Sequence, residues 1–237
     1  MIATAIFDTE AASYDAFCTT PLGQYVDRTE RELLLALLQP GPGEHLIDLG
    51  CGTGAYAVAL AELGCVVTGV DLSRGMLERA RAKARPGLDT RFLEADLARL
   101  PLPDASFDAA LLQVTLEFVA EPAAVFLEAM RILRPGGRLV VGLIHGPGPW
   151  ARSYREKALQ HPDSVYRHAH FWTRPELETV AGMAPTAVRL GLFVGPEEFT
   201  DLTQAEKLEH GRAHRPGEEA GFLAARFERP PLPTSGA

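Results

Sequence analysis

Cysteine, clustered basic residues and long apolar stretches are all scarce in this chain of 237 residues. The three cysteines are widely spaced and form no Cys-x-x-Cys pair, so neither a zinc site nor a disulfide framework is supported. No apolar segment approaches the roughly 20 residues that a membrane-spanning helix needs. The N-terminal residues also lack the basic and apolar regions of a signal peptide. We therefore expect a cytoplasmic protein without a membrane span.

Positive charge is also limited. The 23 Lys and Arg residues are outnumbered by 31 Asp and Glu residues, which gives a formal net charge of −8 at pH 7. Because no basic run is available to follow a phosphate backbone, we expect no nucleic-acid partner. The acidic balance is interpreted as an aid to solubility. The length and the 46% hydrophobic content suit one α/β domain with a full core.

The most informative feature that is present is the glycine-rich run LIDLGCGTG at 46–54. An apolar strand pattern ends there, glycines follow at every second position (Gly50, Gly52 and Gly54), and a helical pattern begins. Glycine adopts left-handed backbone angles and lets the main chain approach a ligand closely. The run predicts a nucleotide-binding strand–loop–helix turn. Its spacing is GxGxG, whereas dinucleotide-binding proteins use GxGxxG.

Strand and helix patterns alternate through most of the chain. Alternation of this kind predicts an α/β fold with a doubly wound, mostly parallel seven-stranded sheet and helices on both faces. Strands are expected at 45–49, 65–70, 90–94, 107–113, 138–144, 186–193 and 220–227, and helices at 22–38, 54–63, 74–84, 122–134 and 174–182.

Two segments interrupt this alternation. We expect a single domain over 1–228, with an N-terminal helical segment at 1–40, a substrate-side insertion at 146–172 and a disordered tail at 229–237. The insertion contains both tryptophans, further aromatic residues and three histidines. These aromatic residues indicate either a lid over an apolar acceptor or a small satellite core. The sequence indicates no role for the second segment, the polar residues 195–217.

An acid ends the second expected strand. Ligands of open α/β sheets bind beyond the carboxyl ends of the strands, where Asp71 would accept hydrogen bonds from ribose hydroxyls. The residue could instead cap the helix that begins near Arg74. Ser73 already supplies that cap, so the ribose role is favoured. An NAD-binding protein would also place an acid here, so Asp71 alone does not identify the cofactor.

Several motifs resemble a known family. The run IDLGCGTG at 47–54 resembles motif I of the class I S-adenosylmethionine (SAM) dependent methyltransferases. LPLPDASFD at 100–108 is similar to the LPFPDxSFD signature of the group that includes the ubiquinone and menaquinone biosynthesis enzymes. RILRPGGR at 131–138 and FWTRPEL at 171–177 resemble a turn and a late helix start of that group. Ser13-Tyr14-Asp15 resembles its N-terminal Tyr-Asp pair, so the match runs from about residue 10 to 183.

The resemblance implies a Rossmann-like methyltransferase fold whose last strand is antiparallel, with SAM as cofactor and S-adenosylhomocysteine as product. The glycine loop would pass under the methionine part of SAM. The backbone carbonyls of Gly50 and Gln113 would accept from its ammonium group, and Tyr14 would close over the cofactor.

Other residues would hold the adenosine. Asp71 would bind the ribose, Leu72 and Met76 would sandwich the adenine, and Asp96 and the Leu97 amide would recognise its edge. Core packing remains an alternative for Leu72 and Met76. The complete set of expected cofactor residues is Tyr14, Asp48, Gly50, Cys51, Gly52, Gly54, Asp71, Leu72, Met76, Asp96, Leu97 and Gln113.

Methyl transfer from a sulfonium places few demands on side chains, because the cofactor carries the reactive group and the protein positions it. A general base is needed only for an acceptor whose proton has a high pKa. His145, which follows the fifth expected strand, is the candidate catalytic residue. The alternative is a loop histidine that bonds to the backbone. His168 and His170 lack a third ligand, so no metal is expected.

These patterns lead to one preferred function. We expect methyl transfer from SAM to a small organic acceptor by a monomer or homodimer. A non-catalytic SAM-binding or interaction protein stays open as an alternative. A nicotinamide-dependent oxidoreductase is disfavoured, since the chain has no Tyr followed four residues later by Lys. The exit of the fourth strand also lacks the (D/N/S)PP(Y/F/W) motif of amino-group DNA methyltransferases.

Overall fold

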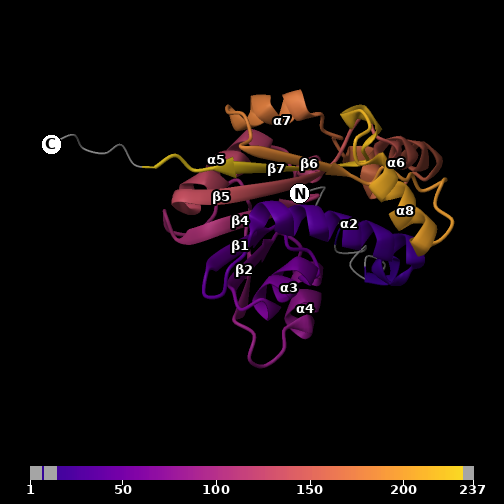
Figure 1. Cartoon of the computed structure of the whole chain (residues 1–237). Helices are drawn as coiled ribbons and strands as arrows, with labels where there is room; N and C mark the ends of the chain where they lie inside the picture. Colours follow the sequence, from indigo (N-terminus) through magenta and orange to yellow (C-terminus); the bar gives the residue numbers. More distant parts are fainter. Residues whose placement is uncertain (1–6, 8–14, 232–237) are drawn as a thin grey trace.

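The strands of the computed structural model, which describes residues 7 and 15–231, form one twisted sheet with the order β3-β2-β1-β4-β5-β7-β6 (Figure 1). Strand β7 runs antiparallel to β5 and to β6, while the other neighbouring pairs are parallel. The predicted mostly parallel seven-stranded sheet with an antiparallel last strand is confirmed. The strands are β1 (His45–Leu49), β2 (Val66–Asp71), β3 (Thr90–Glu94), β4 (Phe107–Gln113), β5 (Leu133–Ile144), β6 (Ala187–Gly191) and β7 (Phe222–Glu228).

Helices cover both faces of the sheet. Helices α2, α3 and α4 lie on one face, and α5 and α7 lie on the other (Figure 1). Their bounds are α2 (Pro21–Leu38), α3 (Ala55–Glu62), α4 (Arg74–Lys83), α5 (Pro122–Ile132), α6 (Pro149–Gln160), α7 (Arg174–Ala181) and α8 (Leu202–Arg212), with short 3₁₀ turns η1 (Leu116–Phe118), η2 (Val165–His168) and η3 (Gly217–Glu219). Among these described helices, none combines the length and apolar composition needed to cross a bilayer.

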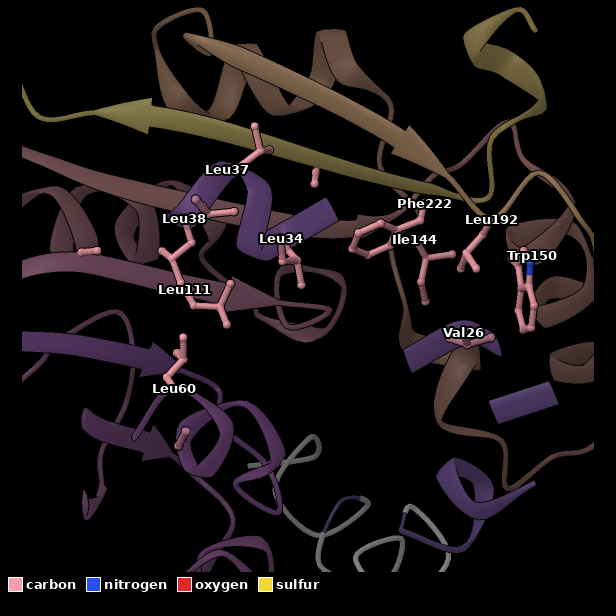
Figure 2. Packing of buried hydrophobic residues seen from close by; sticks show 14 of the residues in the cluster. Val26, Leu34, Leu37, Leu38, Leu60, Leu111, Ile144, Trp150, Leu192 and Phe222 are labelled. Carbon is pink, nitrogen blue, oxygen red and sulfur yellow. The ribbon is translucent and has the colours of Figure 1, made fainter. Parts of the chain in front are cut away.

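The core follows from alternation along the strands. In β5, Val140 points to the face covered by α2, whereas Leu139 and Val141 point to the face covered by α5. Figure 2 shows Leu34 of α2 directed toward the sheet beside Phe222 of β7. Each fully buried large apolar side chain stabilises the fold by about 1.5–3 kcal/mol. Burial on both faces explains why the central strands have continuous apolar sequences.

Two helix starts were predictable from their capping residues. The Ser73 hydroxyl accepts a hydrogen bond from the Met76 amide at 3.1 Å and caps α4. Helix α7 begins with a capping box, in which the Thr173 and Glu176 side chains bond to each other's backbone amides. Both caps are confirmed.

The structure corrects other boundaries. Residues 149–160 form α6 inside the expected insertion, because Trp150, Ala151 and Ala158 provide one buried stripe. Helix α8 occupies much of the polar 195–217 segment. Strand β5 begins at Leu133 rather than at residue 138, since Leu133 pairs with Phe107 across a bulge.

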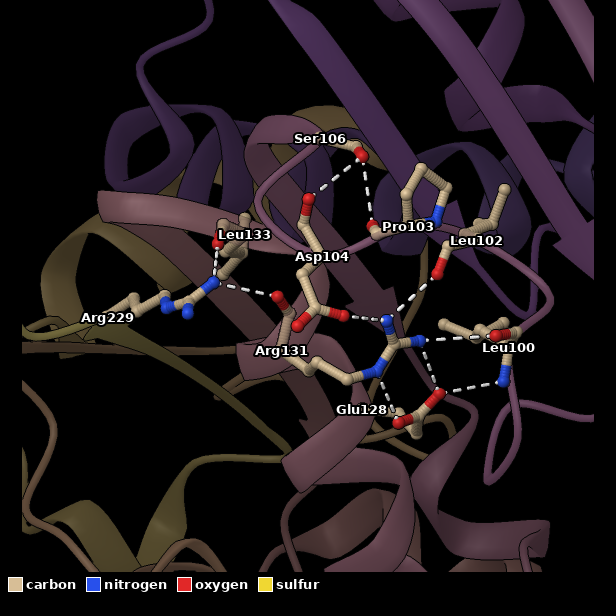
Figure 3. Close-up of polar contacts among 9 residues, drawn as sticks. All are labelled: Leu100, Leu102, Pro103, Asp104, Ser106, Glu128, Arg131, Leu133 and Arg229. Atoms are coloured by element: carbon tan, nitrogen blue, oxygen red, sulfur yellow. Dashed lines mark hydrogen bonds and ion pairs between the residues drawn. The ribbon is translucent and has the colours of Figure 1, made fainter.

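The connection between β3 and β4 has no helix, and residues 95–106 are held instead by Arg131 of α5 (Figure 3). The Arg131 guanidinium donates to the Leu100 and Leu102 carbonyls at 3.2 and 2.8 Å. It also bonds to the carboxylates of Glu128 and Asp104 at 2.7 and 2.5 Å. The LPLPDASFD string therefore serves at least as a structural loop.

Candidate functional site

The glycine loop after β1 requires glycine for steric reasons. Gly50, Gly52 and Gly54 have φ angles of +75°, +50° and +78°. A Cβ on Gly50 would lie 2.3 Å from Thr115 Oγ1, and one on Gly54 would lie 2.8 Å from Ala80 Cβ. A Cβ on Gly52 would meet no atom within 4 Å. The loop is thus packed tightly at both ends, and at Gly52 its backbone faces open space.

Asp71 connects this loop to the turn after β2. Its Oδ2 accepts from the Gly52 amide at 2.8 Å, and its Oδ1 accepts from the Ser73 amide at 2.8 Å. A carboxylate oxygen can accept more than one hydrogen bond, so holding the two turns is compatible with binding ribose hydroxyls. This geometry suits the role expected for Asp71.

The residues expected around adenine differ in exposure. Leu72 is 45% exposed, whereas Met76 is 3% exposed and faces the interior. Of the two, Leu72 presents the apolar surface on which a ring could stack. Asp96 lies exposed after β3 and accepts from the Ala98 amide at 2.9 Å, while Leu97 is 7% exposed.

Asp48 and Cys51 lie beneath the loop. Asp48 is 2% exposed, and its Oδ2 has no hydrogen-bond partner within the described ranges. Burial, followed by the nearby charge of Asp71, raises the pKa of Asp48 to about 7 despite a hydrogen bond from the Ala57 amide. Burial also raises the pKa of the Cys51 thiol well above its ordinary value, which keeps it protonated. These side chains support the loop from below.

Backbone carbonyl groups converge at the start of the glycine loop, next to the end of β4. The Thr115 hydroxyl lies 3.0 Å from the Gln113 carbonyl, 3.4 Å from that of Leu49 and 3.5 Å from that of Gly50. One hydroxyl hydrogen cannot serve three acceptors fully. The carbonyls of Gly50 and Gln113 are the two expected to receive the ammonium of SAM, and the structure brings them together. Thr115, whose hydroxyl lies between these carbonyls, was not predicted from the sequence.

The N-terminal segment is anchored to the same loop. Asp15 Oδ1 accepts from the Thr53 hydroxyl at 2.7 Å and from Lys83 Nζ at 2.6 Å. Burial alone would raise the pKa of Asp15, but the hydrogen bonds from Lys83 and Thr53 outweigh it and lower the pKa. Tyr14, the expected closing residue, lies outside the described residues. Asp15 itself contacts the loop through Thr53.

Two further acids, Glu117 of η1 and Glu30 of α2, lie near the carboxyl end of β4. Glu117 is 2% exposed, and its Oε1 accepts from the Ile144 amide at 2.7 Å. Burial raises the pKa of Glu117 to about 8. Glu30 of α2 accepts from Gln113 Nε2 at 2.7 Å, and burial followed by the charges of Asp27 and Glu117 raises the pKa of Glu30 to about 8. Both carboxyl groups are therefore largely protonated at neutral pH.

His145 follows β5 and is 6% exposed. Its Nδ1 lies 3.0 Å from the Ala220 carbonyl, and its amide donates to the Gly221 carbonyl at 3.0 Å. Because a carbonyl only accepts, Nδ1 carries the hydrogen, and in the neutral ring Nε2 is the basic nitrogen. His145 is thus bonded to the backbone, as the alternative interpretation expected. The same bond selects the tautomer in which a base would act through Nε2.

The insertion builds a satellite core and also a pocket. Tyr154 and Tyr166 stack with ring centroids 4.0 Å apart, and Tyr166 reaches Phe118 of η1 at 6.2 Å. A pocket of about 830 Å³ opens beside these rings, between α6, η2 and the start of α7. Over residues 7 and 15–231, no three His, Cys, Asp or Glu side chains gather where a metal ion could be held.

Comparison with known proteins agrees with this geometry. Residues 47–141 match the model of the Methyltransferase domain family. The demethylmenaquinone methyltransferase of Beutenbergia cavernae is 39% identical over 62% of this chain and 59% of its own length. That of Renibacterium salmoninarum is 34% identical over 66% of this chain and 65% of its own length. The chain thus spans about six tenths of these curated relatives.

A solved structure matches over nearly the full length. The SAM-dependent methyltransferase and possible histamine N-methyltransferase of Thermotoga maritima superposes with a TM-score of 0.75 and 28% identity, covering 96% of this chain and 99% of that chain. The sheet order, the glycine loop and these matches agree with one another. In sequence and in fold, the chain is thus similar to the class I S-adenosylmethionine-dependent methyltransferases, including the quinone-biosynthesis members of that family.

Proposed function

We propose that the protein transfers a methyl group from SAM to a small organic acceptor. The observation that carries this proposal is the convergence of the Gly50 and Gln113 carbonyls on one point, marked by the Thr115 hydroxyl. The single Thr115 hydroxyl hydrogen cannot serve all of these carbonyl acceptors, and an ammonium group of a ligand could donate to them. The open side of Gly52 and the carboxylate of Asp71 continue the same edge toward a ribose position. The residues present therefore fit SAM.

Each part of the site has its own task. The Gly50 and Gln113 carbonyls would hold the ammonium group of SAM, Asp71 would hold its ribose, and Leu72 would cover one face of its adenine. When bound, SAM supplies an electrophilic methyl group on a sulfonium. The chain orients the two reactants, and orientation alone can lower a barrier by roughly 7–11 kcal/mol. Asp15, held by Lys83, joins the start of the described segment 15–20 to Thr53 of the loop.

The acceptor's proton needs a destination if the methylated atom carries one. His145 Nε2 is the proposed base, since its Nδ1 hydrogen is committed to the Ala220 carbonyl. This bond fixes the ring orientation. The insertion at 146–172 forms the acceptor side of the site, because Tyr166 extends to the exit of β4.

The relatives suggest the range of acceptors. The curated relatives are demethylmenaquinone methyltransferases, and the protein of the solved structure is a possible histamine N-methyltransferase. Demethylmenaquinone and histamine are both small organic molecules. The net charge of −8 supports a protein that does not use nucleic acid as a substrate. We also propose that it works in the cytoplasm, as a monomer or homodimer.

Calorimetric titration of the purified protein with SAM, S-adenosylhomocysteine and NAD tests the cofactor. We expect micromolar binding of both adenosyl-sulfur compounds and none of NAD. Product formation with SAM and a panel of small phenols, amines and thiols then tests catalysis. Binding without any product would favour the non-catalytic SAM-binding alternative, and absence of SAM binding would contradict the proposal.

A further inference from the structure

The pocket of about 830 Å³ beside α6 has the size of a small-molecule site, for which roughly 300–1,000 Å³ is usual. Its lining begins with Gly146 and Pro147, immediately after β5 and His145. It therefore opens at the carboxyl end of the parallel strands, the edge at which ligands of such sheets bind. The cofactor roles proposed above leave this pocket unused.

Two arginines give the pocket an unusual charge. Arg155 Nη1 donates to the Gly146 carbonyl at 2.9 Å, and its guanidinium lies 5.0 Å from the centre of the Phe171 ring. Arg167 Nη1 donates to the Ala158 carbonyl at 3.3 Å. In the described part of the chain, neither guanidinium takes part in an ion pair. Each guanidinium has five N–H donors, so most of them remain for a ligand.

The acid in the lining does not neutralise these arginines. Glu176 Oε2 accepts from the Thr173 amide and hydroxyl, both at 2.7 Å, in the capping box of α7. Its Oε1 lies 3.4 Å from His170 Nε2. The pocket therefore presents positive charge in a chain whose net charge is −8.

The remaining wall is apolar. Leu159, which is 83% exposed, contributes apolar surface to this wall. The rings of Tyr166 and Phe171 complete the wall, with centroids 6.3 Å apart. Tyr166 also contacts Phe118, which follows β4, so the aromatic surface extends from the pocket toward the methyl-transfer site. The lining suits a flat apolar body with an anionic end.

We propose that this pocket binds the methyl acceptor by a carboxylate or phosphate group held between Arg155 and Arg167, with an apolar body against Tyr166 and Phe171. The planar guanidinium matches both anions through paired hydrogen bonds. Assigning the ligand as the acceptor rests on the proposed function. Anion binding by the pocket does not depend on it.

Titration calorimetry of the full chain with 2-naphthoate, 2-naphthyl phosphate and the uncharged 2-naphthamide tests the pocket. We expect at least one of the two anions to bind at least ten times more tightly than the amide. Arg155→Gln and Arg167→Gln should each weaken that anion at least fivefold. Arg152→Gln, an exposed arginine of α6 outside the pocket, is the matched control and should change nothing. The anion bound more tightly identifies carboxylate or phosphate as the preferred group.

Equal affinity for the anions and the amide would overturn the proposal, as would anion affinities that neither pocket variant changes. Arg155 also donates to the Gly146 carbonyl, so thermal unfolding is used to check that Arg155→Gln is folded. Arg167→Gln keeps the test decisive if Arg155→Gln is not folded. SAM is titrated into the same samples. Anion binding without SAM binding would contradict the proposed function and leave the pocket assignment standing.

The acceptor assignment has a separate readout. The panel should contain phenol and amine pairs that differ only in a carboxylate or carboxamide. In both pocket variants, we expect kcat/KM to fall at least fivefold for the anionic member and to stay unchanged for the neutral one. An equal fall for both members would show that the arginines do not select the acceptor.

Discussion

Lys83 Nζ lies 2.6 Å from Asp15 Oδ1 and 2.7 Å from Thr53 Oγ1, so one ammonium group joins α4, the glycine loop and the segment before α2. Asp15 and Lys83 are about one-third exposed, at 31% and 34%. Pairs of this exposure stabilise folds by only about 0.2–1 kcal/mol. The contact therefore matters more for the position of the N-terminal segment than for stability.

We predict that Lys83→Met weakens SAM binding roughly three- to tenfold, equivalent to about 0.7–1.4 kcal/mol, and barely shifts the thermal midpoint. The reason is that the segment carrying Asp15 loses its fixed position over the loop. Calorimetry and thermal unfolding measure the two effects. Arg85→Met is the control, since Arg85 pairs with Glu62 instead. Unchanged SAM affinity in Lys83→Met would reject the anchoring role.

Asp71→Ala should abolish detectable SAM binding while the circular dichroism spectrum stays native. The substitution removes the ribose acceptor together with the bonds to the Gly52 and Ser73 amides. Asp71→Asn, which keeps one acceptor oxygen, should bind with intermediate affinity. Asp89→Ala, an exposed acid just before β3, should behave like the unaltered protein. Full affinity in Asp71→Ala would refute the ribose assignment.

His145→Ala should lower kcat roughly 10²-fold or more without changing SAM affinity, because a positioned base contributes about 10²–10⁴ in rate. Steady-state kinetics with a panel acceptor whose methylated atom carries a proton of high pKa, together with calorimetry, measures this. His161→Ala, an exposed histidine of the same insertion, is the control. Unchanged kcat would leave His145 as a loop residue that only bonds to the backbone.

Stability of the ligand-free protein should fall as pH rises, and Glu117 should carry part of this fall. Its pKa is about 8 in the fold and 4.5 ordinarily, so between these values the folded state holds a proton that the unfolded state has released. The stabilisation is complete below pH 4.5 and is lost as pH rises through 8. One proton corresponds to at most about 1.4 kcal/mol per pH unit.

Urea unfolding between about pH 5 and 9 measures this dependence. Glu117→Gln should make the decline shallower, while Glu30 and Asp48, whose pKa values are also raised, should preserve part of it. Glu156→Gln, an exposed acid of α6, is the control. An identical slope in Glu117→Gln and in the unaltered protein would contradict the burial argument.

The sheet was predictable because burial on both faces leaves a local signal. In β2, Val67 and Val70 are both buried, and the run reads as continuously apolar. Helix α8 leaves no such signal, since Ala205 is its buried residue and the rest of its sequence is polar. Helix α6 was not predicted, since its buried stripe consists of Trp150, Ala151 and Ala158 alone, and the aromatic residues of 146–172 were interpreted as a lid or a small satellite core.

The candidate site divides in the same way. The glycine loop and Asp71 are contiguous motifs and were predicted from the residues themselves. Asp15 and Lys83 are 68 positions apart, so nothing local announces their contact. Glu117 could not be recognised, because a buried acid and an exposed acid look alike in sequence. Thr115 is informative only through the three carbonyls that the fold brings to it.

Strand β7 lies between β5 and β6, and within the described sheet β6 pairs with β7 alone. During synthesis β6 is therefore made before the strand it needs, and it must wait as an unpaired segment. The five strands β1 to β5 can assemble earlier through their own parallel pairs. Closure of this side of the sheet is then a late event in folding on the ribosome, and slow codons before 222–228 would prolong exposure of the β5 edge.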